Sequence, residues 1–158
     1  MKKKKLYLET TIPSYMTAWP STSLIVAAHQ AITINWWTAN SMKYDIHISQ
    51  FVIDEASSGD KDAIKRRLDF ISGFKILDVT DEVLSLSKRI INSRLIPTKA
   101  FNDASHIAVA AVHSVDYLLT WNCSHINNAF IKEKLFHLCS EAGYHLPSIC
   151  TPEELMEE

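Results

Sequence analysis

Residues 6–9 read LYLE, three apolar residues followed by a carboxylate. A short apolar run that stops at a polar residue is typical of a buried strand. We therefore predict that the first strand covers Leu6-Tyr7-Leu8 and that Glu9 stands at its carboxyl end. A carboxylate there needs a partner, because burying an unpaired charge is costly. The stretch thus predicts a strand and a polar site together.

Outward from this strand, helical and strand patterns alternate. We predict a loop at 10–21, interrupted by Pro13 and Pro20, and then a helix capped by Thr22 or Ser23. Further strands are predicted at 44–49, 74–79, 117–120 and 148–150. Helices are predicted after Ser49, after Asp60, after either Thr80 or Asp81, and after Asn102. Two more are predicted, one at 128–141 and one after the capping pattern at 151–154. This alternation predicts an α/β fold, with a mainly parallel central sheet flanked by helices.

The composition predicts one folded domain over residues 1–158. Hydrophobic residues make up 47% of the chain, enough for a packed core, which excludes a disordered protein. The net charge is -2, from 16 basic and 18 acidic residues. This balance gives no overall attraction to nucleic acid, so binding of a polyanion would need a local basic patch.

The cysteines and apolar stretches bear on location. Cys123, Cys139 and Cys150 are odd in number and widely spaced, which predicts neither a disulfide framework nor a zinc knuckle. We expect a reducing, cytoplasmic setting. We expect no secretory signal, since the apolar stretch after the N-terminal lysines is interrupted at Glu9 and Pro13. We also expect no membrane-spanning segment, since the apolar stretches of the chain are too short to cross a membrane.

Polar side chains follow the predicted strands. Glu9 follows the first strand, Asn122 follows the strand at 117–120, Glu55 lies in the helix after the second strand, and Asp103 opens a later helix. In parallel sheets, ligands bind at the carboxyl ends of the strands, where these residues can meet. Their oxygen donors suit Mg²⁺ or Mn²⁺. Such a cation offsets the mutual repulsion of the carboxylates and activates water for attack on a phosphodiester.

Three of these residues also have a purely structural interpretation. Asp103 can complement a helix dipole, Glu55 can be an exposed helix residue, and Asn122 can be a turn residue. Glu9 is harder to explain in this way because its strand is buried. The residues alone therefore suggest a metal site without fixing it.

Five segments together resemble a known family. They are YLETTIPS at 7–14, ISQFVIDE at 48–55, NDASHIAVA at 102–110, LLTWN at 118–122 and ICTPEEL at 149–155. In this order they resemble PIN-domain nucleases, specifically the VapC-like toxins of toxin–antitoxin pairs. The resemblance implies a PIN α/β sandwich and an Mg²⁺- or Mn²⁺-dependent endoribonuclease.

The resemblance also implies roles for particular residues. Glu9, Glu55 and Asp103 would be metal ligands, Asn122 would stand where a fourth Asp is usual, and the Thr10 hydroxyl would support the site. Two positions depart from the pattern. Glu9 replaces the commoner Asp and adds a methylene, and Asn122 removes one negative charge. These departures bear on reaction rate and metal stoichiometry, and they permit a pseudo-enzyme.

Histidines and basic residues flank the predicted site. His106 follows Asp103 by one helical turn, and we hypothesise that it or His125 contacts the scissile phosphate or its leaving group; the alternative is a structural hydrogen bond. Arg94 and Lys99 approach the Asp103 segment and can grip RNA phosphates, or form a solvated face. For the basic stretch at 61–67 we favour the solvated face.

The function predicted first is that of a ribonuclease toxin. We expect the toxin to form a homodimer and a cognate antitoxin protein to hold it inactive. Adjacent Trp36 and Trp37 suggest an exposed interface for either partner, or two side chains packed inside the fold. The alternative is a PIN-fold module that binds RNA or protein without catalysis. A receiver-like phosphoacceptor is the third class, which is less favoured because Glu9 has no acidic neighbour.

Overall fold

The protein is built on one parallel sheet. The structure is a computed structural model and describes residues 1–157. Its sheet has the strand order β3-β2-β1-β4-β5, and every neighbouring pair is parallel. The strands are β1 (Lys4–Leu8), β2 (Tyr44–Ser49), β3 (Lys75–Leu77), β4 (Tyr117–Leu119) and β5 (Ser148–Cys150).

Strand β1 lies at the point where the chain changes direction across the sheet. From β1 the chain proceeds to β2 and β3 on one side, and then returns to β4 and β5 on the other. Leu8 is in register with Leu119, so β1 and β4 end side by side. In sheets of this kind, the crevice beyond the carboxyl ends at such a reversal is the usual ligand site.

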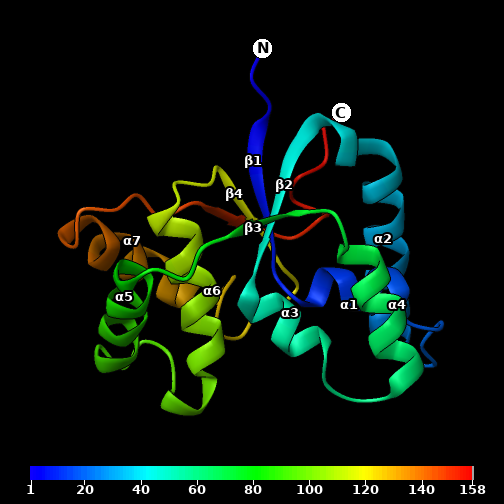
Figure 1. Ribbon diagram of the computed structural model, residues 1–158, viewed down its shortest axis with the longest axis horizontal. Coiled ribbons are helices and arrows are strands. Elements are labelled where there is room, and N and C mark those ends of the chain that lie inside the picture. Colours follow the sequence, from blue (N-terminus) through cyan, green and yellow to red (C-terminus); the bar gives the residue numbers. More distant parts are fainter. Residues whose placement is uncertain (158) are drawn as a thin grey trace.

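Helices cover both faces of the sheet (Figure 1). Figure 1 shows α1, α2 and α4 on one side, α5, α6 and α7 on the other, and α1 and α3 near the carboxyl ends of β1 and β2. Helix α3 contacts both α4 and α6, and so links the two sides. The helices are α1 (Thr11–Thr17), α2 (Leu24–Asn40), α3 (Gln50–Ala56), α4 (Lys61–Ile71), α5 (Asp81–Asn92), α6 (Phe101–Val112) and α7 (Ala129–Glu141).

The α/β class and the parallel sheet predicted from the sequence are confirmed, and so are two predicted helix caps. The Asp60 side chain accepts a hydrogen bond from the backbone of Ala63, and the Thr80 side chain from that of Val83, which stabilises the starts of α4 and α5. The predicted helix cap at Asn102 is wrong, because α6 already begins at Phe101.

The predicted loop at 10–21 is wrong over its first half, which forms helix α1. Pro13 does not prevent this helix because it lies in the first turn, where a backbone N–H has no partner within the helix. Two other predictions need smaller corrections. Strand β3 is shorter than residues 74–79. The capping pattern after β5 makes its hydrogen bonds between Thr151 and Glu154, but only turns follow.

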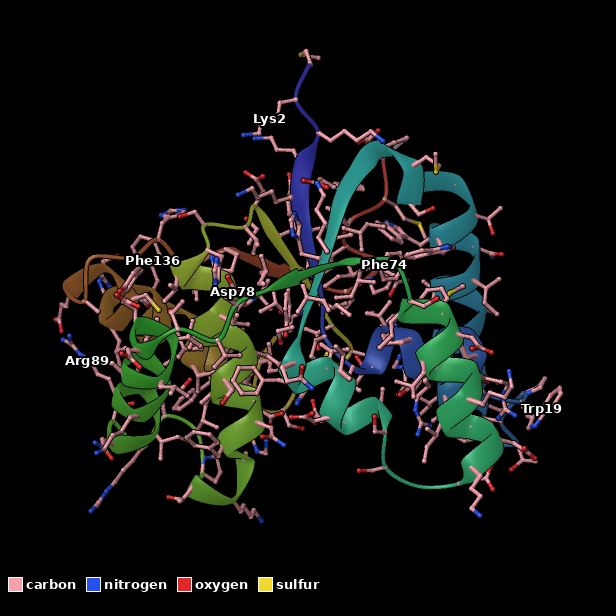
Figure 2. All side chains as sticks on the ribbon, viewed as in Figure 1. Lys2, Trp19, Phe74, Asp78, Arg89 and Phe136 are labelled. Carbon is pink, nitrogen blue, oxygen red and sulfur yellow. The ribbon has the colours of Figure 1, made fainter. Side chains whose placement is uncertain are left out.

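Both adjacent tryptophans pack inside the fold. Trp36 is fully buried, and its indole N–H donates to the carbonyl oxygen of Leu155. Trp37 packs against the rings of Phe70 and Phe74. By contrast, Trp19 lies at the outer edge of the molecule (Figure 2), with the guanidinium of Arg66 4.9 Å from its ring. Within residues 1–157, none of the helices has the length and apolar character needed to cross a membrane.

Candidate active site

Glu9 is a buried carboxylate that is held at the ends of β1 and β4. Its backbone N–H donates to the carbonyl oxygen of Leu119, which extends the pairing of the two strands. Its carboxylate accepts from the Thr11 backbone at 3.0 and 3.1 Å and from Thr120 Oγ1 at 2.9 Å. Burial raises the pKa of Glu9, and the nearby His106 ring and these hydrogen bonds oppose that rise.

Glu55 reaches the same edge of the sheet from helix α3. Its Oε1 accepts a hydrogen bond from Thr10 Oγ1 at 2.7 Å, and His106 Nε2 contacts the same oxygen. Burial acts to raise the pKa of Glu55, but the hydrogen bonds from His106 and Thr10 outweigh it, so the pKa is lowered. Glu55 is therefore a carboxylate held in its charged form.

Asp103 lies in the first turn of α6 and pairs with a second histidine. Its Oδ2 is 2.9 Å from His125 Nδ1. The His125 side chain is 34% exposed and that of Asp103 is 18% exposed, so solvent or a ligand can reach this pair. His125 Nε2 makes no hydrogen bond within residues 1–157.

Asn122 closes a turn directly after β4. Its amide oxygen accepts from the backbone N–H groups of Ser124 and His125, at 3.3 and 3.0 Å, and its own backbone N–H donates to Thr120 Oγ1 at 2.9 Å. This geometry is that of a turn residue, as the structural interpretation of Asn122 expected. The turn also places His125 beside Asp103.

A network of contacts thus links the four predicted residues. Glu9 and Asn122 share the hydroxyl of Thr120, Asn122 fixes the turn that carries His125, and His125 pairs with Asp103. Glu55 is linked to this network by its hydrogen bond with Thr10, which follows Glu9 in the chain, and by its contact with His106 on α6. Arg94 and Lys99 are exposed, on the segment that leads into α6.

His106 has no nitrogen free to meet a substrate. The ring is fully buried, with Nδ1 2.7 Å from Tyr7 Oη and Nε2 against Glu55. These contacts are hydrogen bonds of the kind that the structural interpretation of His106 expects. His125 is the histidine of the site that solvent can reach.

The donors suit a hard divalent cation, although they are not gathered around a common point. Glu55 Oε2 and Asp103 Oδ1 accept no hydrogen bond within residues 1–157, and carboxylate oxygens are the ligands that Mg²⁺ and Mn²⁺ prefer. No three acidic, histidine or cysteine side chains of this part of the chain form a group placed to hold a metal ion. The residues therefore fit Mg²⁺ or Mn²⁺ in chemistry, and binding would require side chains to turn toward the ion.

Sequence reasoning missed several residues of this network. The pairing of His125 with Asp103 depends on a turn that brings together residues 22 positions apart. Tyr7 was assigned only to a strand, because its pattern does not show that its hydroxyl meets Ser49 and His106. Thr120 was the one with a usable signal, since a threonine at the end of an apolar strand must find partners for its hydroxyl.

Comparisons with known proteins agree with this architecture. The model of the PIN domain family matches residues 22–122, a stretch that includes Glu55, Asp103 and Asn122. The fold is similar to that of a chain in the crystal structure of VapBC2 from Rickettsia felis bound to a DNA fragment from their promoter. The two chains are 18% identical with a TM-score of 0.58, and the match covers 92% of this chain and 97% of that one. No curated protein matches.

The family match spans more than half of the chain and covers strands β2, β3 and β4 of the sheet. The sequence, the strand order and the likeness to a solved structure lead to the same result. The chain belongs to the PIN domain family.

Proposed function

We propose that this protein is a metal-dependent endoribonuclease that acts as the toxin of a toxin–antitoxin pair. One observation carries the proposal: Glu9, Glu55 and Asp103, from three distant segments, lie in one network at the sheet reversal of a PIN-domain chain. Partly or fully buried carboxylates are costly to keep charged, and they are typical of sites where a bound cation or a reaction uses them.

Glu9, Glu55 and Asp103 would hold the cation, with Asn122 as a fourth, neutral member and Thr10 as support for Glu55. A bound Mg²⁺ or Mn²⁺ would neutralise phosphate charge and lower the pKa of a water molecule. Because Asn122 uses its amide oxygen to hold the turn, its contribution is to position His125 and Asp103.

The chain's own side chains would orient the substrate. His125 is half-exposed and fixed through Nδ1 by Asp103, so its Nε2 can contact a phosphate oxygen or the leaving group. Arg94 and Lys99 stand exposed on the segment before Asp103, where they would grip the RNA backbone. With a net charge of -2, the protein depends on such a local patch to bind RNA.

A partner protein would control this activity. The structurally similar chain belongs to VapBC2 bound to a DNA fragment from their promoter, and by analogy we propose an antitoxin partner for this chain. We also propose that the chain forms a homodimer. Leu24 and Ile25 leave two neighbouring apolar side chains exposed at the start of α2, and we assign this end of the helix to contact with the partner protein. Free Cys123, Cys139 and Cys150 support a cytoplasmic location.

One observation favours a second function, a PIN-fold module that binds RNA or protein without cutting. Asn122 stands as a turn residue with its oxygen occupied, and Glu55 and Asp103 are paired with histidines. In this arrangement these side chains have polar partners without an ion. The two functions differ in whether a divalent cation brings about cleavage.

The experiment is cleavage of a pool of structured RNAs by purified, antitoxin-free protein with Mn²⁺, Mg²⁺ or EDTA. Asp103→Asn is the control, because a contaminating ribonuclease would remain in that preparation. Cleavage that requires the cation and disappears in Asp103→Asn supports the enzyme. Folded protein that cuts no RNA under any of these conditions supports the binding module.

A further inference from the structure

Behind Glu55 lies a line of buried side chains that the proposed reaction does not use. Tyr7 Oη is 2.8 Å from Ser49 Oγ and 2.7 Å from His106 Nδ1, and the other ring nitrogen of His106 meets Glu55 Oε1. Ser49, Tyr7 and His106 are each fully buried. They come from β2, β1 and α6, so the line crosses from the sheet to a helix and ends at the site.

The direction of these hydrogen bonds follows from the donors available. A carboxylate only accepts, so His106 Nε2 must carry the proton toward Glu55. Among the described residues, the Ser49 hydroxyl meets only Tyr7 Oη. If Tyr7 donated to Ser49, the buried Ser49 proton would have no acceptor, which is costly.

Every proton is therefore satisfied in one arrangement. Ser49 donates to Tyr7 Oη, Tyr7 donates to His106 Nδ1, and His106 Nε2 donates to Glu55. The line fixes both the tautomer and the orientation of the imidazole.

This arrangement has a consequence for the two oxygens of Glu55. Oε1 receives both His106 Nε2 and Thr10 Oγ1, whereas no hydrogen bond within residues 1–157 reaches Oε2. The carboxylate is thus anchored by one oxygen and has the other available.

We propose that Ser49, Tyr7 and His106 are positioning residues that hold Glu55 by Oε1 and leave Oε2 to bind a divalent cation. The binding of a cation by Glu55 Oε2 is the cation half of this proposal, and it rests on the proposed function. The orientation of His106 does not rest on it. Outer hydrogen-bond partners of metal ligands commonly change metal affinity by roughly 10–100-fold, although they never touch the ion.

Two pairs of variants test the cation half through Mn²⁺ affinity, measured by calorimetry. Tyr7→Phe removes the hydroxyl between Ser49 and His106, and Tyr44→Phe is the matched control at the far end of the sheet. We expect affinity to fall roughly 10-fold in Tyr7→Phe and to stay unchanged in Tyr44→Phe. His106→Gln keeps a donor toward Glu55 and should retain most of the affinity, whereas His106→Leu should lose it.

NMR of the imidazole nitrogens tests the orientation in metal-free protein. We expect His106 to carry its proton on Nε2 with Nδ1 unprotonated, and Tyr7→Phe to lose this preference. A proton on Nδ1 of the wild-type protein would overturn the proposal. So would equal Mn²⁺ affinities of Tyr7→Phe and Tyr44→Phe. Wild-type protein that binds no Mn²⁺ overturns the proposed function and the cation half, and the NMR result then decides the positioning of Glu55 by itself.

Discussion

Thr120 Oγ1 donates a hydrogen bond to Glu9 Oε1 at 2.9 Å, and Thr120 Oγ1 also accepts a hydrogen bond from the backbone N–H of Asn122, at 2.9 Å. Thr120 is fully buried, and it directly follows β4, whereas Glu9 directly follows β1. One hydroxyl therefore joins the ends of the two strands at which the sheet changes direction. The local stability of the site and its charge arrangement both depend on this contact.

Replacing Thr120 by Val keeps the shape of the side chain and removes the hydroxyl. We expect the free energy of unfolding, measured in urea, to fall by about 1–3 kcal/mol, because Glu9 loses a donor and the Asn122 N–H loses its acceptor inside the protein. Thr38→Val on the exposed side of α2 is the control and should change stability by about 0.5 kcal/mol or less. Equal effects of the two changes would contradict the assigned role of Thr120.

Glu9→Gln should stabilise the protein at neutral pH. Burial raises the pKa of Glu9 in the folded state, so the folded protein binds this proton more tightly than the unfolded chain. Above the raised pKa the buried charge costs stability. As the pH falls through the raised pKa toward the unfolded value of about 4.3, the cost disappears.

Thermal unfolding between pH 4 and pH 8 measures this effect. We expect the free energy of unfolding of Glu9→Gln to exceed that of the wild-type protein by on the order of 1 kcal/mol near pH 7–8, because the substitution removes a buried charge from a functional site. This difference should disappear near pH 4. Exposed Glu153→Gln is the control and should show no such pH-dependent gain. A gain for Glu9→Gln that grows as the pH falls would contradict the burial of a charged Glu9.

Mn²⁺ should stabilise the folded protein through the carboxylates. Binding to the folded state alone adds about 2.7 kcal/mol when the free ion is at 100 times its Kd, so the melting temperature should rise with Mn²⁺ and return with EDTA. Asp103→Asn should reduce the rise, whereas Asp62→Asn, an exposed change on α4, should not. Equal responses of both variants would place the ion elsewhere.

Reactivity of the thiols tests the packing around α7 and β5. Cys123 is exposed, whereas burial raises the pKa of Cys139 to about 11 and that of Cys150 to about 12. Because the thiolate is the reactive form, a disulfide reagent at pH 8 should modify one thiol quickly in folded protein and all three in denaturant. Fast modification of two or three thiols in folded protein would show that this part of the core is open.

Charge reversal at Arg94 and Lys99 should weaken RNA binding and reduce its dependence on salt. Each phosphate contact that is lost removes roughly 0.7–0.9 from the slope of log affinity against log salt concentration. The control reverses Lys61 and Lys65 on the exposed side of α4, where we expect no contact with RNA. Filter binding to a catalytically inactive variant across a range of salt concentrations measures both slopes. Equal losses in the two charge-reversed proteins would remove the assigned role of Arg94 and Lys99.

Much of the fold could be predicted because its signals are local. The strands around Leu6–Leu8, 44–49 and 148–150 follow from apolar runs, and the caps at Asp60 and Thr80 follow from side chains that precede apolar periodicity. Helix α1 was missed because prolines were taken as interruptions, although Pro13 falls in a first turn that tolerates it.

The site could be predicted only as far as strand ends reveal it. Glu9 directly follows β1 and Asn122 lies three residues after the end of β4, so the parallel order of the sheet brings them to the same edge. The contacts of His106 with Tyr7 and Glu55 depend on how far α6 lies above the sheet, and the pattern of residues does not specify that distance. The exposure of His125 depends likewise on the turn at Asn122.

We propose that Glu9, Glu55 and Asp103 together form a divalent-cation site. The most direct measurement is anomalous X-ray scattering from crystals of the wild-type protein grown with Mn²⁺. We expect an anomalous peak that is bounded by these three carboxylates and is missing in crystals of Asp103→Asn. Mn²⁺ bound only elsewhere, or no bound ion at saturating concentration, would contradict it.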